Sequence, residues 1–151
     1  MWQLAQVNVG TLVGPAGDPR VQLFFDRLDA VNAAAEASDG FVWRLKGEGN
    51  NATDINPTPE PAFVLNISVW RDIEALMAFA YRSDHSSVPA RRSDWFVPHR
   101  RAHLALWWVP AGTRPGADAG LARLWLLDSF GPSPQAFTFG RRFPAPATPP
   151  P

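Results

Sequence analysis

The 151-residue sequence predicts a single α+β domain of the ferredoxin-like type, ordered β-α-β-β-α-β with a helix and an edge strand added at the end. Residues 2–9, 41–46 and 62–70 show the two-residue period of a strand, and residues 102–109 are a fourth strand candidate. Two segments between them carry apolar residues at helical spacing, and the chain is long enough for one sizeable core. We expect the domain over residues 1–143, followed by a proline-rich tail over 144–151 that is extended or disordered.

The first strand and the first helix are expected to open the domain. Residues 2–9 alternate, and one face turns apolar while the other turns polar toward the end of the strand. Asp18 suits the N-cap of the next helix, and Pro19 takes the first helical position, where proline is tolerated. Gly40 lies just past the expected helix end. The apolar stripe of this helix consists of Val21, Phe24, Phe25, Leu28, Val31 and Ala35.

The middle of the chain predicts two strands separated by a long polar loop. The strands are expected over residues 41–46 and 62–70, and the loop over 47–61 is rich in Gly, Asn, Asp, Thr and Pro. In the first of these strands, simple alternation places Phe41, Trp43 and Leu45 opposite Val42, Arg44 and Lys46. The second strand has one wholly apolar face, made of Phe63, Leu65, Ile67 and Val69.

The last third of the chain predicts two further helices, a strand and additions. A helix is expected over residues 72–82, where acidic residues suit its first turn, and a short one over 87–96. The fourth strand is expected over 102–109, a long helix over 117–128 and an edge strand over 136–143. The two crossover helices can cover only one face of such a sheet.

The composition excludes several classes of function. The 14 basic and 14 acidic residues cancel, which favours neither a nucleic-acid nor a membrane partner. The chain has no cysteine, which rules out thiol catalysis and disulfides, and it has no run of about 20 apolar residues. The opening residues predict no signal peptide. We expect a cytoplasmic protein. The spacing of its three histidines gives no convincing metal site, and these are His85, His99 and His103.

Amide and hydroxyl side chains gather on one face of the predicted sheet. That face mixes Gln6, Asn8, Asn66 and Ser68 with Trp, Val and Leu. Such a surface is costly to leave bare, yet too polar for a dry core. We expect a second subunit to pack against it, sheet on sheet, with a small-molecule cavity between the two subunits.

Seven segments together resemble one known family, the domain-of-unknown-function 3291 (DUF3291) family. In chain order they read LAQVNVG, NAAAEASDGFVWRL, LNISVW, YRSDH, DWF, LWWVPAG and GPSPQAFTF, over roughly residues 4–146. The resemblance implies the dimeric αβ-barrel superfamily, which includes antibiotic-biosynthesis monooxygenases, polyketide cyclases and haem-handling enzymes. It therefore implies a homodimeric ferredoxin-like fold and no particular reaction. The basic stretch VPHRRAH departs from the family pattern, which argues against a family-wide role for His99 and His103.

His85 is the first candidate for chemistry. In several enzymes of the superfamily a histidine after the corresponding helix points into the cavity, and a near-neutral pKa suits proton transfer. The alternatives are that His85 caps helix carbonyls, pairs with Asp84 or, by superfamily analogy, ligates haem. Asn66 and Asn8, with Gln6, are candidates to hold a carbonyl or enolate oxygen, or simply bond one another.

Aromatic and arginine side chains complete the candidate site. Arg44, Arg91 and Arg92 are candidates to clamp a carboxylate or phenolate, although the latter two also suit a solvated helix face. Candidate substrate-binding residues are Gln6, Trp43, Arg44, Ser68, Trp70, Tyr81, Trp95, Phe96 and Trp107, with core packing as the alternative for each aromatic.

The sequence thus favours a small-molecule enzyme of specialised metabolism that needs no cofactor. The expected reaction is a cyclisation or isomerisation of a hydrophobic, oxygenated substrate by acid–base catalysis. The alternatives are a cofactor-independent monooxygenase of the antibiotic-biosynthesis type and a non-catalytic protein that binds a small molecule or haem.

Overall fold

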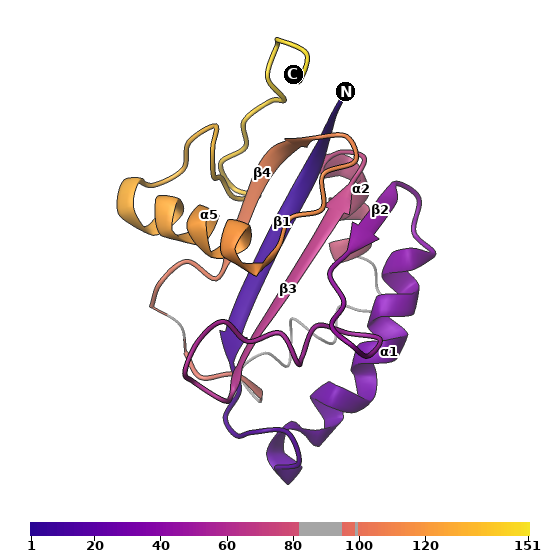
Figure 1. Cartoon of the computed structure of the whole chain (residues 1–151), viewed down its shortest axis with the longest axis vertical. Helices are drawn as coiled ribbons and strands as arrows, with labels where there is room; N and C mark the ends of the chain where they lie inside the picture. Colours follow the sequence, from indigo (N-terminus) through magenta and orange to yellow (C-terminus); the bar gives the residue numbers. More distant parts are fainter. Residues whose placement is uncertain (82–94, 99) are drawn as a thin grey trace.

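The computed structural model describes residues 1–81, 95–98 and 100–151. Its strands pair antiparallel in the order β2-β3-β1-β4 (Figure 1). This is the ferredoxin-like order, so the predicted α+β fold class is confirmed. The elements are β1 (Trp2–Thr11), the 3-10 turn η1 (Pro19–Val21), α1 (Gln22–Glu36), β2 (Phe41–Arg44), β3 (Phe63–Trp70), α2 (Ile73–Ala80), β4 (Leu104–Pro110) and α5 (Ala117–Phe130).

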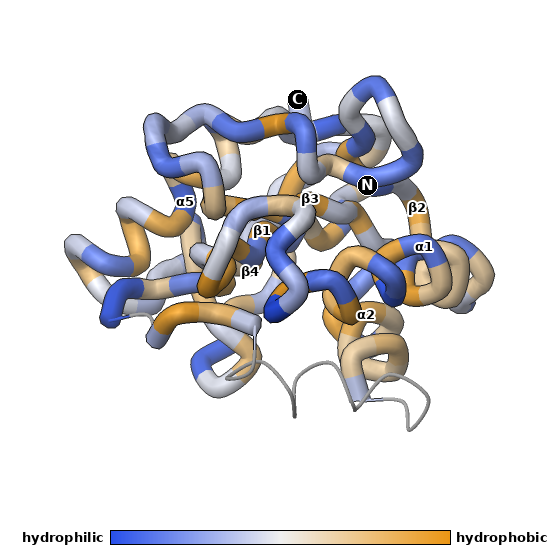
Figure 2. The backbone as a smooth tube through the Cα atoms, turned by 90° about the horizontal axis from the view of Figure 1, so that it is seen from below, coloured by the Kyte–Doolittle hydropathy of each residue, from blue (hydrophilic) through white to orange (hydrophobic). Residues whose placement is uncertain are grey.

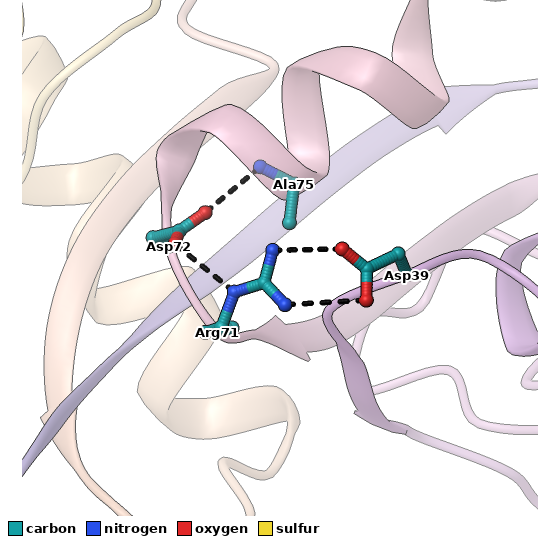
Figure 3. Close-up of polar contacts among 4 residues, drawn as sticks. All are labelled: Asp39, Arg71, Asp72 and Ala75. Atoms are coloured by element: carbon teal, nitrogen blue, oxygen red, sulfur yellow. Dashed lines mark hydrogen bonds and ion pairs between the residues drawn. The ribbon is translucent and has the colours of Figure 1, made fainter.

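The junction between β3 and α2 shows how local chemistry fixes an element boundary. The Asp72 carboxylate accepts a hydrogen bond from the Ala75 backbone N–H at 2.9 Å, which caps the first turn of α2. Arg71 donates from two guanidinium nitrogens to the Asp39 carboxylate at 3.2 and 3.0 Å, as Figure 3 shows. The pair ties the turn before β2 to the start of α2.

The register of β1 and β3 gathers the polar side chains as expected. Gln6 pairs with Ser68 and Asn8 with Asn66, so all four side chains share one face, which we call the amide face. The other side of the sheet, which we call the apolar face, carries the apolar residues of the same strands.

The helices α1 and α2 cover the amide face, although the sequence predicted that they would cover the apolar face. Helices α1 and α2 pack on the amide face, in a cluster with Leu4, Trp70 and Leu106. Helix α5 packs on the apolar face, against Val7 and Ile67. Figure 2 shows α5 on one side of the strands and α1 with α2 on the other. Both faces are therefore covered within one chain, and the expected sheet-on-sheet packing of two amide faces is wrong.

Strand β2 contains an irregularity that alternation does not predict. The register with β3 shifts between Phe41 and Trp43, as at a β-bulge. Phe41 consequently pairs with Trp70 and Arg44 with Ser68, so both lie on the amide face, while Trp43 joins the apolar face. The expectation that Phe41 and Trp43 share a face is corrected.

The C-terminal segment packs on the domain without becoming a regular strand. In place of the expected edge strand over 136–143, Phe137 forms one isolated bridge with Leu106. Beyond it, the Trp108 indole donates to the Phe143 carbonyl and the Trp2 indole to the Thr148 carbonyl, each at 2.9 Å. The proline-rich tail is thus irregular and is hydrogen-bonded to the domain at Thr148. The expected short helix over 87–96 lies mostly outside the described residues.

Candidate functional site

A cavity of about 270 Å³ lies between the amide face and helices α1 and α2. Its roof comes from the apolar stripe of α1 and from Phe79 of α2, and Phe96 and Phe139 reach it from distant parts of the chain. Residues 51–53 of the long loop complete the wall. The cavity is mostly apolar with a few polar groups on one side, as small-molecule sites usually are.

The polar floor of the cavity is a connected array of hydrogen bonds, which we call the amide array. The Gln6 side-chain N–H₂ donates to Asn66 Oδ1 at 2.6 Å and to Ser68 Oγ at 2.8 Å. Asn8 Nδ2 donates to Gln6 Oε1 at 3.0 Å and to Asn66 Oδ1 at 3.3 Å. The Trp70 indole N–H donates to Ser68 Oγ at 2.8 Å. Because each amide uses its oxygen as an acceptor or its nitrogen as a donor to a defined neighbour, the orientation of every amide in the array is fixed.

The array leaves two donor groups facing no protein acceptor among the described residues. Asn66 accepts two hydrogen bonds through Oδ1, and its Nδ2 has no partner in that part of the chain. Ser68 likewise accepts two bonds through Oγ, and its O–H has no described acceptor. Asn8 uses both amide hydrogens within the array, so its part is to orient Asn66 rather than to donate to a ligand.

Arg44 brings a positive charge to the same floor. It pairs with Ser68 across β2 and β3, and its side chain is only 3% exposed. Its Nε donates to Glu36 at 2.9 Å, and its Nη2 lies 2.8 Å from Glu36 and donates to Asn50 at 3.0 Å. Asn50 in turn donates to Asp29 of α1, which ties the long loop to that helix.

Asn32 of α1 is a polar residue that sequence analysis missed. It lies in the roof of the cavity, is 8% exposed, and its side chain has no partner in the described part of the chain. A signal existed in the sequence, since Asn32 follows Leu28 by four positions and so falls on the apolar stripe. An amide at such a position is expensive unless something hydrogen-bonds to it.

The family described as "Domain of unknown function (DUF3291)" matches residues 3–150. The chain belongs to the DUF3291 family. No curated protein matches the chain.

Three solved structures that are similar to this DUF3291 chain share little sequence with it. Rv0793 from Mycobacterium tuberculosis is 13% identical over 76% of this chain and 99% of that chain, with a TM-score of 0.50. PA3566 from Pseudomonas aeruginosa is 12% identical over 77% and 97%, with a TM-score of 0.49. SnoaB, a cofactor-independent oxygenase from Streptomyces nogalater, is 16% identical over 76% and 97%, with a TM-score of 0.46.

Seven of the predicted site residues line the cavity of the DUF3291 chain. They are Gln6, Asn8, Arg44, Asn66, Ser68, Trp70 and Phe96. Trp43 and Trp107 lie on the apolar face, so the expectation that they wall the same cavity is wrong. Tyr81 is 69% exposed, and Trp95 is buried beside Leu12 outside the cavity lining. These aromatics therefore serve packing or the surface.

Three predicted residues, His85, Arg91 and Arg92, fall outside the described residues. The predicted cavity between two subunits is also corrected, because the cavity lies inside a single chain under its own helices. The amide face is covered by α1 and α2 because their apolar stripes match its Leu and Trp residues. The mixed polarity that suggested a partner subunit instead belongs to an internal cavity.

The described residues do not fit haem or a metal. None of those that line the cavity is a His, Cys, Met or Tyr that could serve as an axial haem ligand. Within residues 1–81, 95–98 and 100–151, no cluster of three His, Cys, Asp or Glu could hold a metal ion. No helix in that part of the chain is long and apolar enough to cross a membrane.

Proposed function

We propose that this DUF3291 protein is a small-molecule enzyme that binds a hydrophobic, oxygenated compound in the cavity and stabilises a negative charge on one of its oxygens. The observation that carries the proposal is Asn66 Nδ2, which has no described acceptor and is held at the floor of an apolar cavity by Gln6 and Asn8. A fixed donor in a site that excludes water stabilises a developing oxyanion without reorganising.

The proposed reaction is proton transfer next to a carbonyl, followed by isomerisation or cyclisation. Removing such a proton places charge on the carbonyl oxygen, where the Asn66 amide would donate. The described cavity lining holds no group that titrates near neutral pH. We therefore assign the proton transfer to His85 on the strength of its residue type and its position after α2. Trp70 and Phe79 supply flat apolar walls against which a cyclic substrate would pack.

The test starts with native mass spectrometry of freshly purified protein, to identify a bound compound and to use it as substrate. Asn66→Leu should lower kcat by about 10²-fold, the usual loss for one oxyanion donor. His85→Ala should abolish turnover and leave ligand affinity intact. Trp43→Phe is the matched control, because Trp43 lies on the other face of the same sheet and should leave turnover unchanged.

Other outcomes distinguish the alternatives. Consumption of dioxygen with substrate would identify a cofactor-independent oxygenase. Tight binding without product at any pH would identify a binding protein and would contradict the proposal, as would full activity of Asn66→Leu.

We also propose that the protein is a homodimer, and native mass spectrometry tests this directly. The support for the homodimer is the family resemblance and an exposed aromatic pair on α5, Trp125 and Phe130, which are 61% and 73% exposed.

A further inference from the structure

The charge distribution in the cavity specifies the ligand further. Arg44 is the one charged side chain among the described residues that line it. Three residues that line the cavity have polar hydrogens without a described acceptor, and these belong to the Ser68 hydroxyl, to Asn66 Nδ2 and to Arg44 Nη1. No aspartate or glutamate lines the cavity within the described residues. The floor is therefore rich in donors and carries a positive charge.

The Arg44 guanidinium is held from behind and left open at one nitrogen. Glu36 and Asn50 occupy Nε and Nη2, whereas Nη1 has no partner in the described part of the chain. The side chain is almost fully buried, so solvent cannot fully satisfy that nitrogen. A buried donor of a charged group that is left without an acceptor is costly, and a ligand acceptor would remove the cost.

The neighbouring carboxylate does not cancel the charge inside the cavity. The Glu36 side chain is 42% exposed and does not line the cavity, so water screens it. The Arg44 charge is screened much less because it is buried. The ion pair therefore presents its positive partner, and not its negative one, to a bound molecule.

We propose that the cavity binds an organic carboxylate with an apolar body, with one carboxylate oxygen on Arg44 Nη1 and the other on the Ser68 hydroxyl. Arg44 and Ser68 are register partners on adjacent strands, which sets their side chains side by side on the amide face. Two adjacent donors match the two oxygens of a carboxylate. The apolar roof, with Phe79 and Leu28, would enclose the rest of the molecule.

This inference rests on the proposed function only in taking the cavity as the ligand site. It adds the class of substrate: an apolar acid whose carboxylate lies near the carbonyl that Asn66 would polarise. The two sets of donors are separate, so binding of the acid and stabilisation of the oxyanion can fail independently.

The experiment compares 2-naphthoate with 2-naphthamide by isothermal titration calorimetry on the full chain. The two probes share an apolar body and nearly the same shape, and only the first is charged. We expect wild-type protein to bind 2-naphthoate at least about tenfold more tightly, since a charge-assisted hydrogen bond is worth about that factor or more. Arg44→Gln should remove this preference and change naphthamide affinity by less than about threefold. Arg20→Gln, an exposed arginine outside the cavity lining, is the matched control and should keep the preference.

Equal affinity for the two probes, or binding of neither, overturns the inference. Because both measurements use wild-type protein, this result does not depend on whether Arg44→Gln folds. A preserved preference in a folded Arg44→Gln variant also overturns it. Failure of turnover with a preserved preference for 2-naphthoate would count against the proposed reaction alone.

Discussion

Replacing Ser68 with alanine should lower the free energy of unfolding by about 2–4 kcal/mol. The Ser68 oxygen accepts hydrogen bonds from the Gln6 amide and the Trp70 indole, each at 2.8 Å. Gln6 is 4% exposed and Trp70 is 1% exposed, so the indole N–H and one of the two Gln6 amide hydrogens would be left buried without an acceptor, while the other Gln6 hydrogen keeps Asn66 Oδ1. Each buried donor without an acceptor costs about 1–3 kcal/mol. The upper limit of the summed loss is lower here, because the substitution also removes a hydroxyl hydrogen that has no described acceptor.

Chemical denaturation with a two-state fit measures this loss directly, and the melting temperature should fall by about 4–16 °C for a chain of this length. The control is Ser129→Ala on the exposed end of α5, which should change stability by less than about 0.5 kcal/mol. A double-mutant cycle with Trp70→Phe isolates the indole bond. The cost of Ser68→Ala should shrink by about 1 kcal/mol in that background, because one of the two donors is already gone.

A Ser68→Ala loss below about 1 kcal/mol would contradict the predicted cost of leaving these donors without an acceptor. Additivity of the two substitutions within about 0.5 kcal/mol would likewise contradict the predicted indole bond, since additivity would mean that the serine and the indole do not interact in solution.

Three further predictions follow from packing, capping and charge. Gly120→Ala should lower the free energy of unfolding, measured in urea, by about 1 kcal/mol. The new Cβ would lie 2.9 Å from a methyl of Val7, and this crowding outweighs the gain in helix propensity. A more stable variant would show that α5 does not pack closely on the sheet. Asp72→Ala should lower the free energy of unfolding by about 1 kcal/mol, because α2 loses its N-cap. Asp72→Asn should largely preserve stability, and equal losses in the two variants would contradict a capping role. Hydrogen bonds from Arg20 lower the pKa of Asp18 from 3.8 to about 2, so the stability that this pair contributes is complete above pH 3.8 and is lost as the pH falls toward 2. Carboxyl NMR titration of wild type and Arg20→Gln checks this, and an unchanged Asp18 pKa in the variant would refute it.

Much of the fold could be predicted because its signals are local. The N-cap at Asp72 and the stripe of α1 each depend on residues within a few positions of one another. The alternation in β1 and β3 likewise placed Gln6, Asn8, Asn66 and Ser68 on one face, and the structure gathers them into the amide array. Hence the placement of these four polar side chains on one face of the sheet was predicted correctly.

The sequence did not show which helix covers which face of the sheet. Both faces of the sheet contain Leu, Val and Trp, so hydropathy alone does not assign them to particular helices. Helix α5 reaches the apolar face because Gly120 lets it approach Val7 closely, a contact between residues far apart in the sequence. The bulge before Trp43 is also set by pairing with β3, and it turns Trp43 and Arg44 to opposite sides of the sheet.

The order of the elements and the polar character of one sheet face are visible in the sequence, because propensity, periodicity and capping act over short distances along the chain. The packing of distant segments sets three other features: this face lies under the chain's own helices, Arg44 lines the cavity with no described partner at Nη1, and Asn32 lines its roof. Those facts depend on how distant segments pack, and packing is settled by shape and by the cost of burying each polar group, neither of which a linear pattern records.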